Sequence, residues 1–339
     1  MRHSAGTRLG KQWLFVVCLT PLLFLGRADS QTCLASADMP DPLRSGLELA
    51  ARRYFEMSAH GDGAGLRQNS IPLLAGNFSG VEAAVKDNAA AFTGAQATVR
   101  PPFQLTADGP EPLPRAEFLC GVFGKTGQTA DSAVFVLNNL PPGKYGVVIL
   151  DVKGGKEGRM LTMILQQAGG DWKLAGFYVR PSEAAGHDAA WYAGKAREYK
   201  KKSQNHNAWL YFREATTLSS PVDFMSTQAS DRLYDETQSV QPADMPANGN
   251  AVDLSAVGRT FRMTEIFPLA VGGELDVVVK YSSLDISNTQ KTFQDNMAVI
   301  KALVVKYPEL KEAFAGVVAR AVTPSGQDYG SMLPMKEIK

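Results

Sequence analysis

The chain has 339 residues, of which 45% are hydrophobic and 20% are charged, with a formal net charge of +1. This composition is typical of a globular protein and excludes a wholly disordered chain. The near-neutral balance provides no general electrostatic attraction to nucleic acid or to an anionic membrane surface, so we expect neither as a partner.

The first thirty residues predict a secretory signal peptide. Arg2, Arg8 and Lys11 precede the apolar run 13–25, and small residues follow it. This run is shorter than the roughly 20 apolar residues that a membrane-spanning helix needs. We therefore expect a cleaved leader at 1–30, a secreted or periplasmic protein and no stable membrane span; an uncleaved anchor is the alternative. Removal of the leader leaves 31 basic and 33 acidic residues, a formal charge of −2.

Two cysteines, Cys33 and Cys120, lie beyond the leader. In an oxidising compartment such a pair predicts one disulfide. The alternative interpretation is a buried thiol at Cys120, inside the apolar segment 118–122, with a free Cys33. No histidine lies near either cysteine in the sequence, which argues against a structural zinc site. We expect neither a metal nor another cofactor.

The first ordered element is predicted to be a helix. Asp41 and Pro42 suit its beginning, and Gly61 and Gly63 suit its end. Between them, apolar residues recur at helical spacing at Leu43, Leu47, Ala50, Tyr54 and Met57. The capping-box pattern from Ser79 to Glu82 predicts a later helix that continues through Ala91.

After residue 96 the pattern changes to strands separated by Gly- and Pro-rich turns. The predicted strands are 97–105, 115–123, 133–137, 145–152, 159–166 and 172–179. Short links between long strands favour an antiparallel, meandering sheet. Helices followed by strands indicate the α+β class, in which the leading helices pack on the sheet, and argue against the alternating order of a dinucleotide-binding fold.

Two segments resemble the nuclear-transport-factor-2-like, or ketosteroid-isomerase-like, superfamily. The first is Leu49-Ala50-Ala51-Arg52-Arg53-Tyr54-Phe55-Glu56-Met57-Ser58-Ala59-His60-Gly61-Asp62, which is similar to the superfamily's opening helix and its exit. The second, residues 170–179, contains Trp172 and Phe177 and resembles its closing strand. The resemblance covers about residues 40–182 and implies a cone fold, a strongly curved antiparallel sheet around leading helices. It implies little about activity, because this fold carries both enzymes and binding modules.

A helical region follows residue 182. Tyr192, Ala196, Tyr199, Ala208 and Phe212 are spaced nearly as in one tetratricopeptide-like helical hairpin, with Ala215 and Pro221 after them. A single hairpin cannot form a solenoid, so we expect a spacer packed on a neighbouring element.

The C-terminal part is predicted to be a small α/β segment. Alternating apolar residues predict a strand over 274–281, and a helical stripe runs from Phe293 to Tyr307 and stops at Pro308. Leu310, Phe314 and Val317 suggest a second, shorter helix. The expected division of the chain is a signal peptide at 1–30, a cystatin/nuclear-transport-factor-2-like α+β domain at 40–182, a helical hairpin region at 183–238, a linker at 239–256 and the α/β segment at 257–339.

The mouth of a cone-shaped domain is its natural binding site. Isomerase-type chemistry there needs a carboxylate base opposite a tyrosine or a protonated acid that binds the enolate oxygen. The pocket candidates are Tyr54, Glu117, Asp131, Tyr145 and Asp151. None shows the superfamily's Tyr–Asp pairing at an alignable position, and we assign no catalytic residue.

The sequence therefore favours a non-enzymatic module that binds a small apolar ligand or a protein partner. One alternative is a cofactor-independent isomerase, dehydratase or hydrolase with a carboxylate in the cone. Another is a structural envelope protein. A homodimer formed through the sheet is also an expectation.

Overall fold

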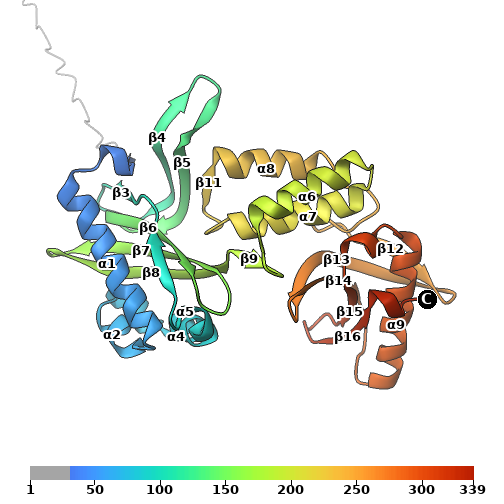
Figure 1. Ribbon diagram of the computed structural model, residues 1–339. Coiled ribbons are helices and arrows are strands. Elements are labelled where there is room, and N and C mark those ends of the chain that lie inside the picture. Colours follow the sequence, from blue (N-terminus) through green and yellow to red (C-terminus); the bar gives the residue numbers. More distant parts are fainter. Residues whose placement is uncertain (1–30) are drawn as a thin grey trace, which may run out of the picture.

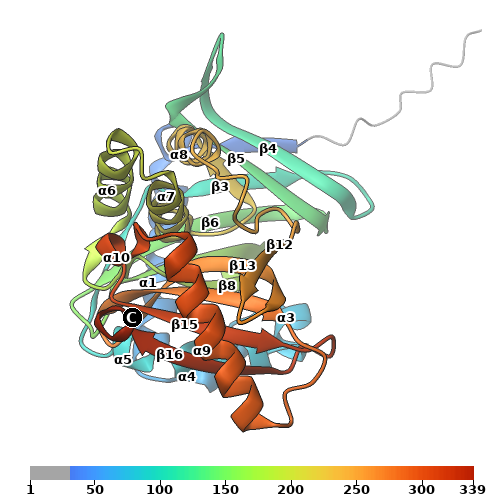
Figure 2. The ribbon, with the colours of Figure 1, turned by 90° about the vertical axis from the view of Figure 1, so that its right-hand side faces the viewer.

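The computed structural model describes residues 31–339, so the predicted leader lies outside the described residues. The chain forms three connected parts (Figure 1). An α+β part comes first, a helical hairpin region follows, and a C-terminal part contains a second sheet. The view turned by 90° in Figure 2 shows α9 on the side of the C-terminal sheet that faces away from the N-terminal part. Between residues 31 and 339, no helix combines the length and the apolar character needed to cross a bilayer.

Helices cover one face of the first sheet. They are η1 (Ser36–Asp38), α1 (Asp41–Ala59), α2 (Gly63–Gln68), α3 (Pro72–Gly76), α4 (Ser79–Asp87) and α5 (Ala89–Phe92). The predicted stripe of α1 is confirmed in outline, since Leu47 and Tyr54 are buried, although Ala51 is buried more deeply than Ala50. The expected capping box is wrong, because Ser79 is already helical and the cap residue makes no side-chain hydrogen bond. The helix also stops short of Ala91.

The first sheet has six strands that pair only antiparallel. The order is β1 (Gln31–Leu34), β3 (Phe103–Ala107), β6 (Gly143–Lys153), β7 (Arg159–Ala168) and β8 (Asp171–Pro181), with β2 (Gln96–Val99) also on β6. The single strand expected over 97–105 is two strands. Pro101 and Pro102 lie between them, where neither can donate a ladder hydrogen bond.

The expected meander is interrupted, because β4 (Leu113–Gly124) and β5 (Gly127–Leu140) leave the first sheet. They form a long hairpin, which we call the arm, and pair with β11 (Met225–Thr227) in a separate three-stranded sheet. The arm projects from the rest of the molecule in Figure 1. One apolar cluster lies between the arm and the first sheet, and a second lies between that sheet and α1.

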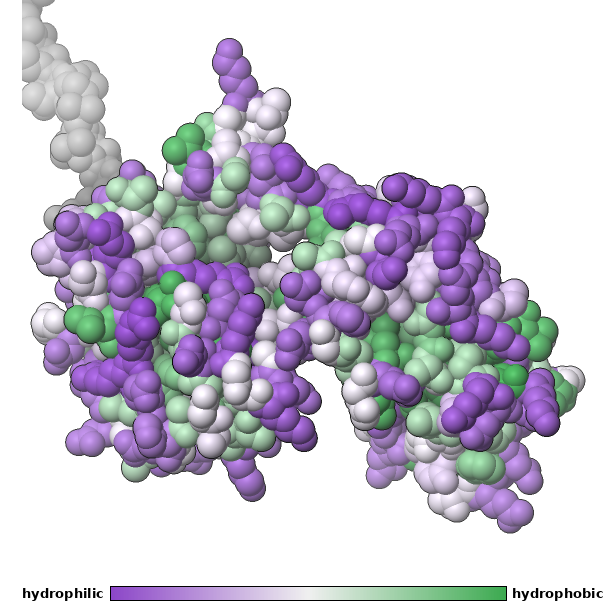
Figure 3. All heavy atoms as spheres, in the orientation of Figure 1, coloured by the Kyte–Doolittle hydropathy of each residue, from purple (hydrophilic) through white to green (hydrophobic). Residues whose placement is uncertain are grey.

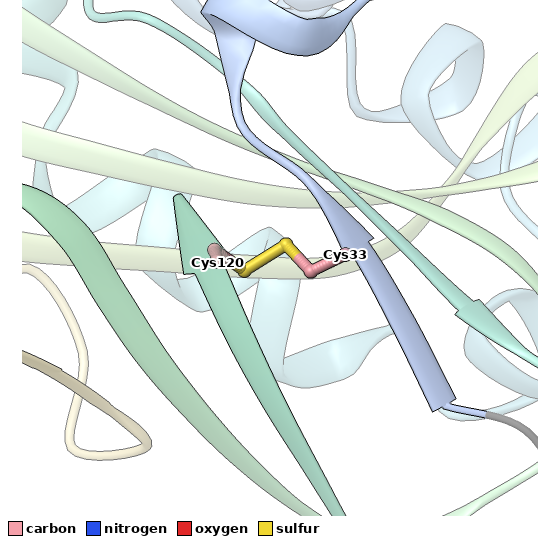
Figure 4. The surroundings of a disulfide bond; sticks show 2 residues. All are labelled: Cys33 and Cys120. Atoms are coloured by element: carbon pink, nitrogen blue, oxygen red, sulfur yellow. A yellow bond between two sulfur atoms is a disulfide. The ribbon is translucent and has the colours of Figure 1, made fainter. Parts of the chain in front are cut away.

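A disulfide joins the arm to the first strand (Figure 4). Cys33 lies in β1 and Cys120 in β4, 87 residues apart, with their Cα atoms 5.0 Å apart. The backbone N–H of Glu117 also donates to the Gln31 side chain at 2.6 Å. The bond therefore closes a long loop and fixes the arm, at a point in the second half of β4, to the sheet that the arm has left.

The helical hairpin forms as its spacing predicts. A short turn of β9 (Glu183–Ala184) and β10 (His187–Asp188) leads into α6 (Ala189–Lys201) and α7 (Asn205–Ser219). The Asp188 side chain caps α6 by accepting the backbone N–H of Trp191 at 2.9 Å. An additional helix, α8 (Gln228–Gln238), follows β11 and was not expected.

The C-terminal part contains a five-stranded mixed sheet. The order is β12 (Val252–Ala256), β13 (Arg259–Val271), β14 (Glu274–Ser282), β15 (Gly316–Val322) and β16 (Asp328–Pro334), and η2 (Met335–Glu337) ends the chain. The one parallel pair, β14 with β15, is connected through α9 (Thr289–Lys306) and α10 (Leu310–Ala313). Two expectations need correction, since residues 252–256 of the expected linker form a strand and Val317 lies in β15 instead of a second helix.

One continuous apolar cluster unites the hairpin with the C-terminal sheet. It includes Phe212 of α7, Ile266 of β13 and Ile300 of α9, and it extends from Ala184 to Ile338. Val240 and Met245, inside the segment expected to be a linker, are buried in the same cluster. The hairpin is therefore built into the C-terminal core, and α7 is held in a fixed place relative to β13.

The disulfide gives a first testable prediction. Closing a loop of 87 residues limits the unfolded chain, so reduction is expected to lower the free energy of unfolding by about 4 kcal/mol in the chain-entropy model. Urea unfolding with and without a thiol reductant, followed by circular dichroism, measures the change. The Cys33→Ala/Cys120→Ala variant should be insensitive to the reductant, and equal midpoints for oxidised and reduced protein would contradict the prediction.

Candidate functional site

The two tyrosines expected in a cone pocket lie on opposite faces of the first sheet. Tyr54 is buried on the α1 side, where its hydroxyl is 2.9 Å from the carbonyl oxygens of Asn69 and Trp172. Tyr145 is buried in the cluster under the arm and donates to the Pro141 carbonyl at 2.8 Å. Both hydroxyls are therefore used to tie elements together, and the two side chains do not meet.

The three acidic candidates are also separated. Glu117 and Asp131 are exposed on β4 and β5 of the arm. Asp151 of β6 forms a two-pronged ion pair with Arg100, at 2.9 and 2.6 Å, and lines a cavity of about 740 Å³. The structure does not bring the five candidates together into one site.

A larger cavity lies where the N-terminal part, α7 and β13 meet; we call it the interdomain cleft. Figure 3 shows the notch between the two parts, below the helical hairpin, with hydrophobic surface on the C-terminal part beside it. Its volume is about 1040 Å³, which is large for a site that holds a small molecule. Four segments form its walls, within 156–159, 179–186, 213–217 and 267–273, together with Asn88.

The α7 wall carries the most unusual group of the cleft. Glu214 is only 8% exposed, although it belongs to a residue type that is rarely buried without a partner. Within residues 31–339 its carboxyl group makes no hydrogen bond and no ion pair. Burial raises the pKa of this carboxyl group from 4.5 to about 7, and the nearby positive charge of Arg213 opposes the rise.

Helix geometry explains why Glu214 is in this position. Residues Trp209, Leu210 and Phe212 of α7 are buried in the shared core. Arg213 and Thr217, one turn apart, therefore border the cleft, and Glu214 lies beside them at the rim of the packed face.

Two contacts, with the Ile266 carbonyl and with the Trp209 ring, hold the Arg213 side chain in place. Its guanidinium group donates to the backbone carbonyl of Ile266 and lies 4.8 Å from the centre of the Trp209 ring. Burial lowers the pKa of Arg213. The side chain connects α7 to β13 and is already satisfied, so it does not neutralise Glu214 by direct contact.

The opposite wall of the cleft is rich in cations that have acidic partners. Arg159 donates to Glu157 at 2.6 Å and to Asn88 at 2.8 Å, and Arg180 donates to the exposed Asp223 at 2.6 Å. Exposed pairs of this kind contribute little energy and can exchange partners. Apolar residues also line the cleft, Val179 on the β8 wall and Phe267 and Leu269 on the β13 wall.

A second cavity, the one that contains Asp151, adjoins the interdomain cleft. Glu183 and Gly186 of the β9–β10 turn line both cavities. The rings of His187 and Trp191 stack at 3.7 Å on its wall. The polar groups of this cavity have partners inside the protein, as shown by the Arg100–Asp151 pair and by Asp188 at the cap of α6. It therefore makes a weaker case for a ligand than the interdomain cleft does.

The histidines do not form a metal centre. Within residues 31–339 no group of three or more His, Cys, Asp or Glu side chains is arranged to hold a metal ion. His206 of α7 instead bridges two carboxylates, Asp244 at 2.9 Å and Glu309. This bridge fastens the segment after α8 and the end of α9 to the hairpin.

The sequence analysis missed Glu214. The signal was present, because a charged pair, Arg213-Glu214, follows the apolar run Trp209-Leu210-Tyr211-Phe212 directly. A carboxylate next to a helix face that must be buried suggests either a surface position or a functional one. Deciding between them requires the position of β13, which the sequence does not provide.

Comparisons with known proteins do not add to this geometry. No family model, no curated protein and no solved structure matches the chain. The resemblance of residues 40–182 to the cone fold therefore still rests on the order of the elements and on the two segments 49–62 and 170–179. Any function has to be argued from the interdomain cleft itself.

Proposed function

We propose that this protein is an exported, non-enzymatic binding protein whose ligand occupies the interdomain cleft. The observation that carries the proposal is Glu214, a residue that is only 8% exposed, lines a cavity of about 1040 Å³ and has a carboxyl group that accepts no hydrogen bond from another of residues 31–339. Burial disfavours the charged form of this carboxyl group, and a ligand that supplies a donor or a positive charge offsets part of this cost. The apolar wall beside it provides contact area for the rest of the ligand.

Two further features support the export and the cone-fold parts of the proposal. Disulfides persist in oxidising compartments, and the Cys33–Cys120 bond agrees with a secreted or periplasmic location. Helices on one face of an antiparallel sheet are consistent with the cone-like arrangement over residues 40–182. The ligand site proposed here lies outside that cone, since both cone tyrosines are structural.

Capture of ligands from the natural environment tests the binding function. Immobilised full-length protein is exposed to an extract of the exported fraction of its host, and the retained compounds are identified by mass spectrometry. We expect a set of species that the wild type retains and that Glu214→Leu loses, because the leucine offers no acceptor. Glu117→Gln, a change at an exposed carboxylate of the arm, is the control and should retain the same species. Identical retention by the wild type and Glu214→Leu would contradict the proposal.

The pKa of Glu214 predicts how the stability of the free protein depends on pH. A carboxyl group whose pKa is raised on folding favours the folded state at low pH, and this contribution is lost as the pH rises through the folded pKa. Between pH 4.5 and pH 7 the loss amounts to about 3 kcal/mol. Glu214→Gln should abolish this loss, so the variant is expected to be more stable than the wild type at pH 8.

Urea unfolding at pH 5 and pH 8 measures this effect. The difference between Glu214→Gln and wild type should be below about 1 kcal/mol at pH 5 and should approach 3 kcal/mol at pH 8. Glu117→Gln serves as the control for removal of one negative charge. A Glu214→Gln variant that is less stable than the wild type at pH 8 would show that the carboxylate has a partner inside the folded protein.

One observation favours a second function, that of a cofactor-independent isomerase, dehydratase or hydrolase. A carboxyl group with a pKa of about 7 in a cavity is suited to general acid–base catalysis near neutral pH. We place it second, because among the described residues no second acidic, basic or hydroxyl side chain of the cleft wall forms a hydrogen bond with the Glu214 carboxyl group.

The carboxylate of such an enzyme would be Glu214 and none of the earlier candidates. Substrate profiling at pH 7 should then show a turnover that Glu214→Gln lowers at least 100-fold. Asp131→Asn and Glu117→Gln should leave it unchanged, because both residues are exposed on the arm. The absence of a Glu214-dependent turnover would remove the enzyme hypothesis and leave the binding function.

A further inference from the structure

The strand β12 lies at one end of the C-terminal sheet, so one of its edges is unpaired. Among the described strands it pairs with β13 alone. The turn between the two strands has two residues, Val257 and Gly258, with φ angles of 47° and 75°, the geometry of a tight hairpin. The residues that flank this turn, 256 and 259, therefore form a hydrogen-bonded pair. Such pairs alternate along the ladder with pairs that make no hydrogen bond.

This alternation directs the main-chain groups of Asp253 and Ser255 to the outer edge of β12. Their partners in the register, Arg262 and Thr260, belong to the pairs without a hydrogen bond. The Lys306 side chain agrees with this direction, because its Nζ reaches the Asp253 carbonyl at 3.5 Å, the outer limit of hydrogen bonding. Both edge residues are exposed. Two N–H and two C=O groups can therefore pair with an added strand.

Helix α9 lies beside this edge and forms a groove with it, which we call the β12–α9 groove. The groove has a volume of about 530 Å³ and is lined by residues 253–257 and, on α9, by Ala298, Lys301, Ala302, Val305 and Lys306. Arg259, just after the turn, pairs with Asp295 in the first half of α9. Lys306, at the end of α9, reaches back to Asp253. The helix and β12 therefore run in opposite directions along the groove.

The α9 wall of the groove contains an exposed apolar strip. Ala298, Ala302 and Val305 recur at spacings of four and three residues, which place them on one face of the helix. Val305 is 80% exposed, whereas Ile300 and Leu303 on the adjoining face are buried in the shared core. Apolar side chains gathered beside an open strand edge indicate a surface that another chain covers.

The charges of the groove favour an acidic occupant. Lys301 and Lys306 lie on the α9 wall, and within residues 31–339 the Lys301 ammonium group makes no hydrogen bond or ion pair. The one acidic residue of the described lining is Asp253. Its side chain points to the outer face of the sheet, because the next residue, Leu254, is buried in the core that α9 covers. A segment that faces α9 therefore meets two positive charges and, among the lining residues, no negative one.

We propose that the β12–α9 groove binds an extended acidic polypeptide segment of a partner protein as an added strand on β12. Residues of the segment opposite Asp253 and Ser255 would bond to the β12 main chain. The side chains between and beside them point to α9, where an apolar side chain contacts Ala302 and flanking carboxylates meet Lys301 and Lys306. The site is separate from the interdomain cleft. A second copy of the chain fits less well, because pairing of two β12 edges would bring the lysine-bearing walls of both copies together.

Binding of a defined peptide tests this proposal. Because β12 has five residues, the probe is the peptide Glu-Thr-Val-Thr-Glu, amidated at its C-terminus. It carries tetramethylrhodamine, a label without net charge, on a Gly-Gly spacer at its N-terminus. Fluorescence anisotropy with the full-length protein at pH 7 and low salt measures the affinity. The Lys301→Gln/Lys306→Gln variant should bind about fivefold more weakly or worse, because each exposed ion pair changes affinity severalfold. The Gln-Thr-Val-Thr-Gln peptide should lose a similar factor and should not distinguish this variant from the wild type.

The strand pairing has its own matched controls. With the valine facing α9, the threonine N–H groups point to β12 and the valine N–H points away from it. N-methylation of the second threonine should therefore weaken binding about fivefold or more, and N-methylation of the valine should leave it unchanged.

A variant of the protein tests the same pairing from the other side. Ser255→Pro removes an outward N–H that the pairing with β13 does not use, so the variant should fold and should lose a similar factor in affinity. Lys311→Gln and Glu214→Gln lie outside the groove and should bind the probe as the wild type does. Circular dichroism verifies that each variant folds, and the N-methylated peptides keep the test decisive if Ser255→Pro does not.

Three results would overturn the proposal. The first is a probe that does not bind, or that binds the double lysine variant as tightly as the wild type. The second is equal affinity of the two N-methylated peptides for the wild type. The third is a dimer in analytical ultracentrifugation that Ser255→Pro dissociates, because a second copy would then occupy the edge of β12. None of these results bears on the interdomain cleft, whose ligand is tested through Glu214.

Discussion

The burial of one carboxyl group in α7 is the constraint on which the cleft depends. Glu214 sits next to residues of the shared core, so the helix cannot rotate to release it without exposing Phe212 and its neighbours. Exposure of a phenylalanine side chain costs roughly 2–3 kcal/mol, comparable to the penalty for keeping a neutral carboxyl group without a partner. The helix therefore holds a partly desolvated carboxyl group in place, and the cavity that it lines is where a partner group can enter.

The same packing explains how parts that are distant in sequence form one site. The hairpin is built into the C-terminal core, and the β9–β10 turn connects it directly to β8 of the first sheet. Arg213 fixes α7 to the outer edge of β13 through the Ile266 carbonyl. The cleft is thus lined on one side by a rigid unit of helix and strand, and on the other by the end of β8 and the loop before β7. Motion between the two sides would change the width of the cleft without disturbing either core.

Much of the fold was predictable because its signals are local. The helical stripe over 43–57 and most of the strand runs between Gly- and Pro-rich turns follow from side-chain periodicity alone. Which strands pair with one another does not follow from periodicity. Nothing in 113–140 indicates that the arm leaves the first sheet, since that depends on β11 and on the disulfide, which are far away in sequence. Strands β15 and β16 were missed for a related reason, because a short apolar run such as 317–321 is compatible with helix or strand until its neighbours are known.

The site was less predictable than the fold, and the reason is geometric. The cone candidates were chosen for their chemistry, yet Tyr54 and Tyr145 use their hydroxyls to bond backbone carbonyls inside two separate clusters. Glu214 was not chosen as a candidate. The helical hairpin was expected to be a spacer, and a glutamate on such a helix is an ordinary surface residue. Its environment arises only when β13 packs beside α7. A glutamine at this position would retain the shape and avoid the cost of the charge. A carboxyl group that lowers the stability of the free protein is therefore better explained by what it binds than by what it holds together, as expected where function is gained at the expense of stability.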